Sequence, residues 1–321
     1  MPKKTLIAYA ALLIVTLIWS AATPVIKLTL QYVPVFTFLF LRFLIVCIVL
    51  LPFTILELKK NPVHKKDLIN FLLLGIFSQS GIAFIFVGLK YTTALDATVI
   101  GIMAPLLSVA AGHYFFREKV STGVKVGVIL AVIGTLLVVF EPVIFHTTEG
   151  TPTILRLFGN LLVIAYNFTF LMYIIWSKIS LGQNSQILKK TLHFIHLKPM
   201  TKKYSEFMLT SVTFYVALAT FIPLAILEHV KNPDFRFTAM PVTPFLGILF
   251  MSLLSSIVAY SLFEWALNKV TVSDTAIFSY LTPIFTVPFA FLLVGETPSK
   301  LTLIGSAIIA LGVVIAEKKK A

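Results

Sequence analysis

The sequence predicts an all-α integral membrane protein with ten transmembrane helices in two inverted five-helix repeats. The first observation is composition, because 58% hydrophobic and 12% charged residues with a mean hydropathy of +0.98 over 321 residues are not typical of a soluble protein. The second is that the apolar residues fall into runs of about 20, the length that crosses the hydrocarbon core as a helix. The third is an internal repeat.

Polar and helix-breaking residues in the middle of the chain recur near its end. Each of five residues has its counterpart 178 positions later: Asp96, Pro105, Glu118, Gly127 and Gly134 match Asp274, Pro283, Glu296, Gly305 and Gly312. Apolar sequences share Leu and Val by chance but not acids, prolines and glycines, so these matches indicate a duplication. Each copy belongs to a half with five expected spans, and an odd number places the copies in opposite orientations. Inverted repeats of this kind are typical of secondary transporters.

The expected spans follow one another with short connections, which requires helical hairpins. Closed barrels would show shorter alternating segments instead. The spans are predicted near 5–24, 35–56, 67–89, 93–115, 121–141, 157–178, 206–228, 244–267, 273–294 and 300–317. We therefore expect a first repeat over residues 1–145 and a second over 156–318, with a basic loop at 179–205.

The distribution of basic residues predicts that both termini and the 179–205 loop face the cytoplasm. Of the 26 Lys and Arg residues, Arg42 lies within a span and six lie on the opposite side, which leaves 19 on the cytoplasmic side; the six are Lys27, Lys90, Arg156, Lys231, Arg236 and Lys300. Cytoplasmic loops of membrane proteins carry such an excess. We expect a multi-pass protein of the cell (cytoplasmic) membrane.

Several short motifs occur in an order that is specific only when they are taken together. They are Trp19-Ser20 followed by Lys27, Leu41-Arg42-Phe43, Gly88 to Ala94 leading into Pro105, and Glu118 ahead of Gly127 and Gly134, with a less complete copy in the second half. Over nearly the whole chain this pattern resembles the EamA family of the drug/metabolite transporter superfamily. The resemblance implies a ten-helix inner-membrane secondary transporter with a central cavity. The 179–205 loop is longer than is usual for that family.

Arg42 is the ionisable residue that lies well inside a span, where insertion costs roughly 2.5–3.5 kcal/mol. In one interpretation it attracts or positions an anionic group of a substrate. In the other it pairs with helix-terminal carbonyls and holds two helices together. The resemblance favours the second, because the family carries an arginine here across diverse substrates.

Four further residues are candidates for substrate binding: Trp19, Gln79, Asn167 and Tyr260. The amides of Gln79 and Asn167 supply neutral donors and acceptors at membrane depth, where they either line a cavity or bridge helices. Tyr260 is expected to line a cavity. Trp19 either contacts substrate or packs as an ordinary interfacial residue.

The acids and glycines of the repeat have structural interpretations. Asp96 and Asp274 begin spans, where a carboxylate is favoured by the helix dipole, and Glu118 and Glu296 precede the capping residues Ser121 and Ser299. The glycine pairs are spaced by seven residues, which places each pair on one helix face and permits close packing.

Metal and nucleic-acid chemistry have little support in the sequence. His193 and His196 lack the Cys or acidic companions that a zinc site needs, so we expect no metal and no cofactor. The net charge of +13 is confined to short Lys clusters between apolar runs, and no nucleic-acid motif accompanies it. Cys47 is the only cysteine, which excludes an internal disulfide.

The leading functional hypothesis is a carrier for a small metabolite or drug-like solute in the lipid bilayer, working by alternating access. A scaffold or assembly protein remains an alternative because it needs no site residues. An intramembrane enzyme or a channel is disfavoured, since no span carries a nucleophile with its base or a repeated selectivity segment. The sequence leaves open the substrate, the direction of transport, proton coupling and whether the protein forms a homodimer.

Overall fold

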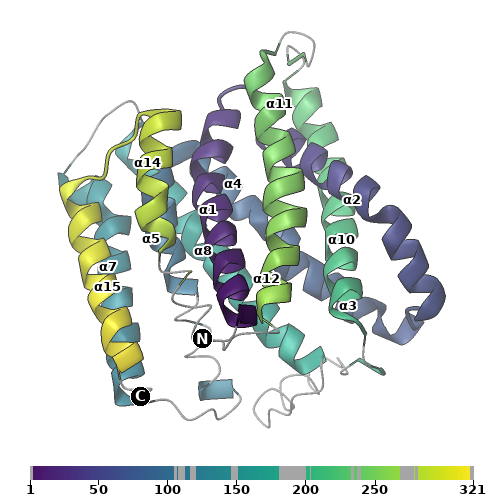
Figure 1. Cartoon of the computed structure of the whole chain (residues 1–321). Coiled ribbons are helices and arrows are strands. Elements are labelled where there is room, and N and C mark those ends of the chain that lie inside the picture. The colour runs from purple at the N-terminus through teal and green to yellow at the C-terminus, as the bar shows by residue number, and fades with distance from the viewer. Residues whose placement is uncertain are drawn as a thin grey trace.

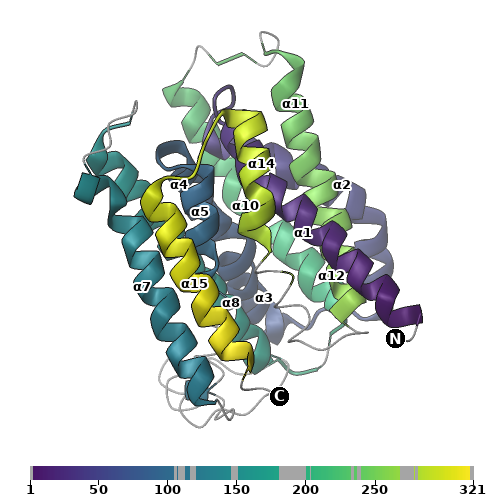
Figure 2. The ribbon, with the colours of Figure 1, turned by 60° about the vertical axis from the view of Figure 1, so that its left-hand side comes forward.

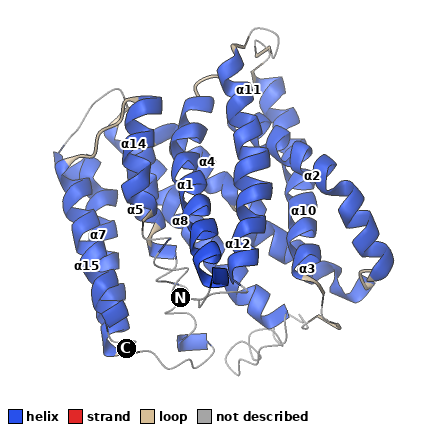
Figure 3. Cartoon of the chain, viewed as in Figure 1, coloured by secondary structure: helices blue, strands red, loops and turns tan. Residues whose placement is uncertain are grey.

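A computed structural model describes residues 3–104, 107, 113–115, 121–145, 151–180, 200–202, 204–232, 235–236, 240–267, 278 and 281–318. Every regular element within these ranges is helical (Figure 3). In the first half the elements are α1 (Lys3–Thr29), α2 (Val35–Lys60), η1 (Lys65–Asp67), α3 (Leu68–Gly75), η2 (Ile76–Ser80), α4 (Ile82–Tyr91), α5 (Ala94–Gly101) and α7 (Thr122–Phe145). In the second half they are α8 (Thr153–Ser180), α10 (Glu206–Lys231), α11 (Val242–Leu249), η4 (Phe250–Val258), α12 (Ala259–Leu267), α14 (Thr282–Val294) and α15 (Lys300–Lys318).

Seven helical segments in the described part of the chain are long and apolar enough to cross a membrane. They correspond to the expected first, second, third, fifth, sixth, seventh and eighth spans. The expected third span is continuous over Lys65–Tyr91, and the eighth covers Val242–Phe263. Two shorter apolar helices, Thr282–Val294 and Lys300–Ile315, lie within the last two expected spans. The count of ten stays a prediction, because only parts of the expected spans 93–115 and 273–294 are described.

The helices form a bundle in which α1 begins and α15 ends at the same end (Figures 1 and 2). Helix α1 packs against α12 and α14, while α8 packs against α4 and α5. We call α1, η4, α12 and α14 the first helix group, and α8, η2, α4 and α5 the second helix group. Helices α7 and α15 pack on each other at one side of the bundle, and α2 packs on α10.

The glycines of the repeat form the contact between α7 and α15. A Cβ atom added to Gly134 would lie 2.6 Å from the carbonyl oxygen of Gly305, and one added to Gly312 would lie 2.8 Å from that of Gly127. Residue numbers rise along α7 as they fall along α15, so the two helices are antiparallel. The prediction that these glycines permit close packing is confirmed.

The expected helix caps are also present. The Ser299 hydroxyl accepts from the backbone N–H of Thr302 at 2.9 Å, and the Ser121 hydroxyl accepts from that of Val124 at 3.4 Å. Helix α7 differs from the prediction by running through Pro142 to Phe145, beyond its expected end at residue 141. Residues 142–145 therefore continue the helix beyond the expected span.

The start of α10 is attached to the connection between α2 and α3. The buried Asp67 carboxylate accepts hydrogen bonds from the backbone N–H and hydroxyl of Thr201 at 2.8 and 2.7 Å and from the Tyr204 hydroxyl at 2.7 Å. Burial, together with the bond to Asp67, raises the pKa of Tyr204 to about 12. These bonds attach the described end of the 179–205 segment to the first half, while residues 181–199 lie outside the described residues.

Candidate functional site

Three of the five candidate residues meet around the π-helical segment η4. The Trp19 ring lies 5.5 Å from that of Tyr260 in an edge-on arrangement, and its indole N–H donates to the Ser255 carbonyl at 3.3 Å. The guanidinium of Arg42 donates to the hydroxyl of Ser256, the next residue of η4. A single short segment therefore positions Trp19, Arg42 and Tyr260 together.

Arg42 is 4% exposed and makes fewer polar contacts than the clamp interpretation requires. Its Nε and Nη2 atoms both donate to the Ser256 hydroxyl, at 3.1 and 3.0 Å. This acceptor is a side-chain hydroxyl, not the helix-terminal carbonyls expected from the sequence. The guanidinium also lies 5.2 Å from the ring centroid of Phe43 and 5.7 Å from that of Phe86. The Tyr166 and Tyr260 side chains lie within electrostatic range of it.

Gln79 and Asn167 are buried amides with one unsatisfied oxygen each. Asn167 donates to the Ile100 carbonyl at 2.9 Å and so bridges α8 to α5, while its Oδ1 atom has no hydrogen-bond partner among the described residues. The Oε1 atom of Gln79 on η2 also has none. Buried polar atoms normally have partners, so the two free oxygens are available to another donor. Asn167 is next to Tyr166 in the chain, whereas no hydrogen bond in the described part of the chain joins Gln79 to the cluster at η4.

The two halves contain π-helical turns at matching positions. Residues 76–80 form η2, and the positions 178 further on, 254–258, lie within η4. Such turns in otherwise α-helical segments are frequent at functional sites. Thr220, which is 178 positions after Arg42, contacts the Ser80 hydroxyl at 2.9 Å. Both π-helical segments are thus held by a polar side chain from the other half of the chain.

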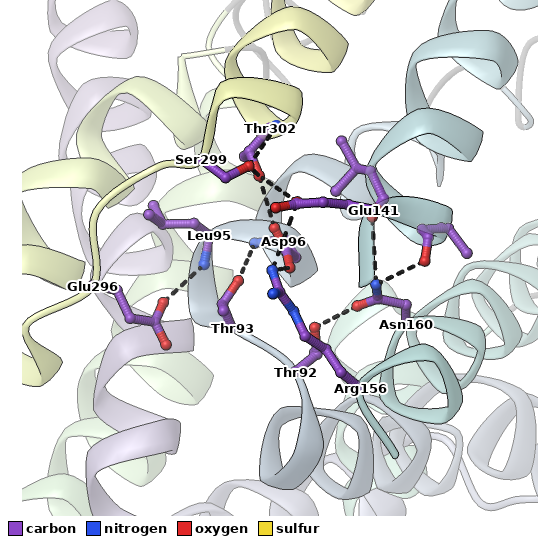
Figure 4. A network of polar contacts seen from close by, with 12 residues as sticks. Thr92, Thr93, Leu95, Asp96, Glu141, Arg156, Asn160, Glu296, Ser299 and Thr302 are labelled. Carbon is purple, nitrogen blue, oxygen red and sulfur yellow. Dashed lines mark hydrogen bonds and ion pairs between the residues drawn. The ribbon is translucent and has the colours of Figure 1, made fainter. Parts of the chain in front are cut away.

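A network of charged residues joins the halves at the end of the bundle opposite the chain termini (Figure 4). Arg156 Nη2 lies 2.7 Å from Asp96 Oδ2 and 3.6 Å from Glu141 Oε2. The Thr302 hydroxyl contacts Asp96 at 2.9 Å and Glu141 at 3.2 Å. Both carboxylates are buried, and Asp96 lies in the first turn of α5 as its helix-dipole role requires.

The second part of the network connects the two helix groups. The Glu296 carboxylate, just beyond α14, accepts from the backbone N–H of Ala94 at 2.7 Å and that of Leu95 at 3.3 Å, at the N-terminus of α5. Glu296 also pairs with Lys27 at 3.1 Å, and Lys27 donates to the Thr92 carbonyl. Glu296 therefore bridges separate helices in addition to standing in a turn.

Sequence reasoning did not find this network, although it singled out Asp96 and Glu296 as members of the repeat. Asp96 and Arg156 are 60 positions apart, and Glu296 is 202 positions from Ala94. Residue spacings within one helix give no information about pairs that are this far apart in the sequence. The only available signal was the small set of basic residues on the non-cytoplasmic side, which includes Lys27 and Arg156.

No group of His, Cys, Asp and Glu side chains that could hold a metal ion occurs in the described part of the chain. The prediction about His193 and His196 lies outside the described residues. The arrangement in the described part offers hydrogen-bond donors, buried amide oxygens and aromatic rings, which are groups that bind a solute.

The bundle defines a polytopic helical membrane protein, and comparison with known proteins identifies its family. The model of the EamA-like transporter family matches residues 6–140 and 191–317, so the chain belongs to this family. The resemblance to the EamA family of the drug/metabolite transporter superfamily is confirmed, and the protein is a membrane transporter.

Two curated relatives match along nearly the whole chain. An uncharacterized transporter of Archaeoglobus fulgidus is 28% identical over 312 residues, which cover 95% of each chain. The uncharacterized transporter YetK of Bacillus subtilis is 25% identical over 322 residues, with 99% of this chain and 89% of the relative covered. A solved crystal structure with 19% identity and a TM-score of 0.55 covers 98% of this chain and 99% of its own, which shows a shared fold.

Proposed function

We propose that the protein is a secondary transporter that moves a small metabolite or drug-like solute across the cell membrane by alternating access, and that it catalyses no reaction. Ten helices in two inverted repeats, 1–145 and 156–318, carry this mechanism. Substrate is held near the repeat interface by Trp19, Gln79, Asn167 and Tyr260, with Arg42 beside them. The observation that carries the proposal is a set of contacts that occur twice, related by exchange of the two halves.

One pair of contacts and one self-related contact follow this exchange. The Gly134–Gly305 contact becomes Gly127–Gly312 when each residue is replaced by its counterpart 178 positions away. The stacked rings of Phe43 and Phe221, 5.6 Å apart and 178 positions apart, are exchanged with each other. Antiparallel packing of matched helices such as α7 and α15 is expected of a two-fold axis in the membrane plane.

The first expected span of each half makes an equivalent contact, although the matching residues of these two spans are separated by fewer than 178 positions. Asn167 donates to the Ile100 carbonyl at 2.9 Å, and Thr16 donates to the Phe278 carbonyl at 3.3 Å. Ile100 and Phe278 are 178 positions apart, while Thr16 and Asn167 are 151 apart. The smaller offset is consistent with the long 179–205 segment, which follows the sixth expected span and has no equivalent in the first half.

The charged network supports a closed end of the transport path. Lys27 lies on α1 of the first helix group and Glu296 directly follows α14 of the same group. Both contact the segment 92–95 at the start of α5, in the second helix group. One turn deeper, the hydroxyls of Thr23 on α1 and Thr98 on α5 lie 2.8 Å apart. In alternating access these contacts break when the groups separate and the opposite end closes.

A disulfide between the helix groups tests this mechanism. In a Cys47→Ser background, Thr23→Cys with Thr98→Cys is expected to form a disulfide, because hydroxyls in contact place the Cβ atoms near disulfide range. Oxidation should abolish saturable uptake and counterflow into liposomes, and a reductant should restore them.

The control is the pair Ser80→Cys and Thr220→Cys, because the hydroxyls of Ser80 and Thr220 are 2.9 Å apart. This pair joins η2 to α10, and α10 packs on η2 of the second helix group, so its disulfide does not join the two helix groups. Oxidation of this control should leave uptake largely intact. Full uptake by the oxidised Thr23/Thr98 pair would overturn alternating access at this end. No flux in any reduced variant, or in the unmodified protein, would favour the scaffold alternative.

We also propose that both termini and the 179–205 loop face the cytoplasm. Single-cysteine labelling of Gln183→Cys in the same Cys47→Ser background tests this topology. A membrane-impermeant thiol reagent should fail to label intact cells and should label inverted vesicles, because the 19 basic residues assigned to that side favour the cytoplasm. Labelling in intact cells would contradict the topology.

A further inference from the structure

In the described part of the chain, the buried charge of Arg42 has no counterion. Its only hydrogen-bond acceptor in the described part of the chain is the Ser256 hydroxyl, and no carboxylate there pairs with it. Arg156 differs, since Asp96 and Glu141 lie beside its guanidinium. A buried charge is costly unless it is paired and hydrogen-bonded.

The geometry also leaves part of the guanidinium fork unused. The Nε and Nη2 donors share one oxygen, and the Nη1 atom makes no hydrogen bond to the described residues. Ser256 is fixed in this role, because its own hydroxyl donates to the Met251 carbonyl at 2.8 Å. Guanidinium groups bind planar carboxylates through two parallel N–H donors, and a ligand of this shape fits the unused donors.

Aromatic rings surround the charge on several elements. Phe43 and Phe86 lie against the guanidinium, and Tyr260 packs between Trp19, at 5.5 Å, and Phe214, at 6.3 Å. Such a lining favours a ligand with an apolar or aromatic portion next to its charged group, because binding sites for small molecules usually combine apolar walls with a few polar groups. The charge is confined to one half of the chain, because the position matching Arg42 is the neutral Thr220.

We infer that Arg42 is the anion-binding residue of the transport site, and that the substrate is a small organic acid with an apolar or aromatic body. This inference rests on the proposed function, because it assigns a substrate class to the site of the proposed carrier. The carboxylate takes the place of the missing counterion beside Ser256, and the apolar body packs against Trp19 and Tyr260.

Thermal unfolding of the purified protein with three probes of similar shape tests the inference. Phenylacetate, phenylacetamide and 2-phenylethylamine present an anion, a neutral amide and a cation on the same ring. A ligand that binds the folded state raises the Tm by mass action. We expect phenylacetate to raise it and the other two to have little effect. Equal effects of all three, or no effect of phenylacetate, would overturn the inference.

Variants of Arg42 separate an anion site from a helix clamp. Arg42→Met should weaken phenylacetate binding by at least about tenfold, the change expected when a charge-assisted hydrogen bond is lost, and Arg42→Lys should recover part of it. The Tm of Arg42→Met without ligand should equal or exceed that of the unmodified protein, because an unpaired buried charge is removed. A clamp predicts a lower Tm with unchanged phenylacetate binding, which would contradict the inference.

Arg236→Met is the matched control, since Arg236 is exposed and lies outside the cluster at η4. It should change neither the Tm nor the binding of phenylacetate.

Uptake into liposomes distinguishes the inference about the anion site from the proposed carrier function. Saturable uptake of 2-phenylethylamine but not of phenylacetate would refute the anionic substrate and still support a carrier. Binding of phenylacetate at Arg42 without uptake or counterflow would support the anion site and refute the carrier.

Discussion

Replacing Arg156 by Gln should destabilise the protein by about 3–5 kcal/mol, the cost of leaving a buried charge without its partner. The Asp96 and Glu141 side chains are 1% and 2% exposed, and Arg156 provides the cation next to both. Without it, two carboxylates face each other around the Thr302 hydroxyl. The measurement is the unfolding free energy of the purified protein in detergent.

The matched control for this variant is Arg236→Gln, which removes the same charge from an exposed position. Its unfolding free energy should change by less than about 0.5 kcal/mol, as is usual for surface substitutions. The double variant Arg156→Gln with Asp96→Asn should recover part of the loss, because one of the unpaired carboxylates is removed. Equal stability of the Arg156 and Arg236 variants would show that the network does not hold the halves together.

Replacing Gly134 by Ala should weaken the contact between α7 and α15. The added methyl group would lie 2.6 Å from the Gly305 carbonyl oxygen, and backbone atoms cannot move aside as a flexible side chain can. Overpacking of this kind costs about 1–3 kcal/mol and here outweighs the roughly 0.5–1 kcal/mol that Ala gains over Gly inside a helix. We expect a lower Tm and reduced transport.

Gly101→Ala provides the control for the Gly134 variant. Among the described residues, no heavy atom lies within 4 Å of a Cβ atom built on Gly101, and this residue also belongs to a helix. Its Tm should stay the same or rise slightly. If Gly134→Ala also left the Tm unchanged, the close approach of α7 and α15 would contribute little to stability.

Features that depend on neighbouring residues were predictable from the sequence. Apolar runs of about 20 residues determine where helices can cross a membrane, and seven of the expected spans are present as long apolar helices. The Ser121 and Ser299 caps depend on backbone N–H groups three residues away, and the repeated glycines depend on helical spacing. Each of these follows from local geometry that the order of residues specifies.

The candidate site was predictable in its members but not in their arrangement. The cost of a charge at membrane depth identified Arg42, yet its acceptor proved to be Ser256, 214 positions away. Likewise, Trp19 and Tyr260 could be named separately, but their ring contact depends on how α1 packs against α12. The π-helical turns gave no signal in the sequence, because they arise from packing between helices.

The sequence by itself determined the membrane class, the repeated residues and the positions of the seven long apolar helices. Hydropathy, helix propensity and duplication are properties of residues that are close together or in order along the chain. Only the tertiary structure decided which charges meet. Asp96 with Arg156 and Glu296 with Lys27 are paired, while Arg42 has no carboxylate partner in the described part of the chain. The physical reason is that the free energy of a buried charge depends on groups a few ångströms away in space, which helix packing brings together irrespective of their separation in sequence.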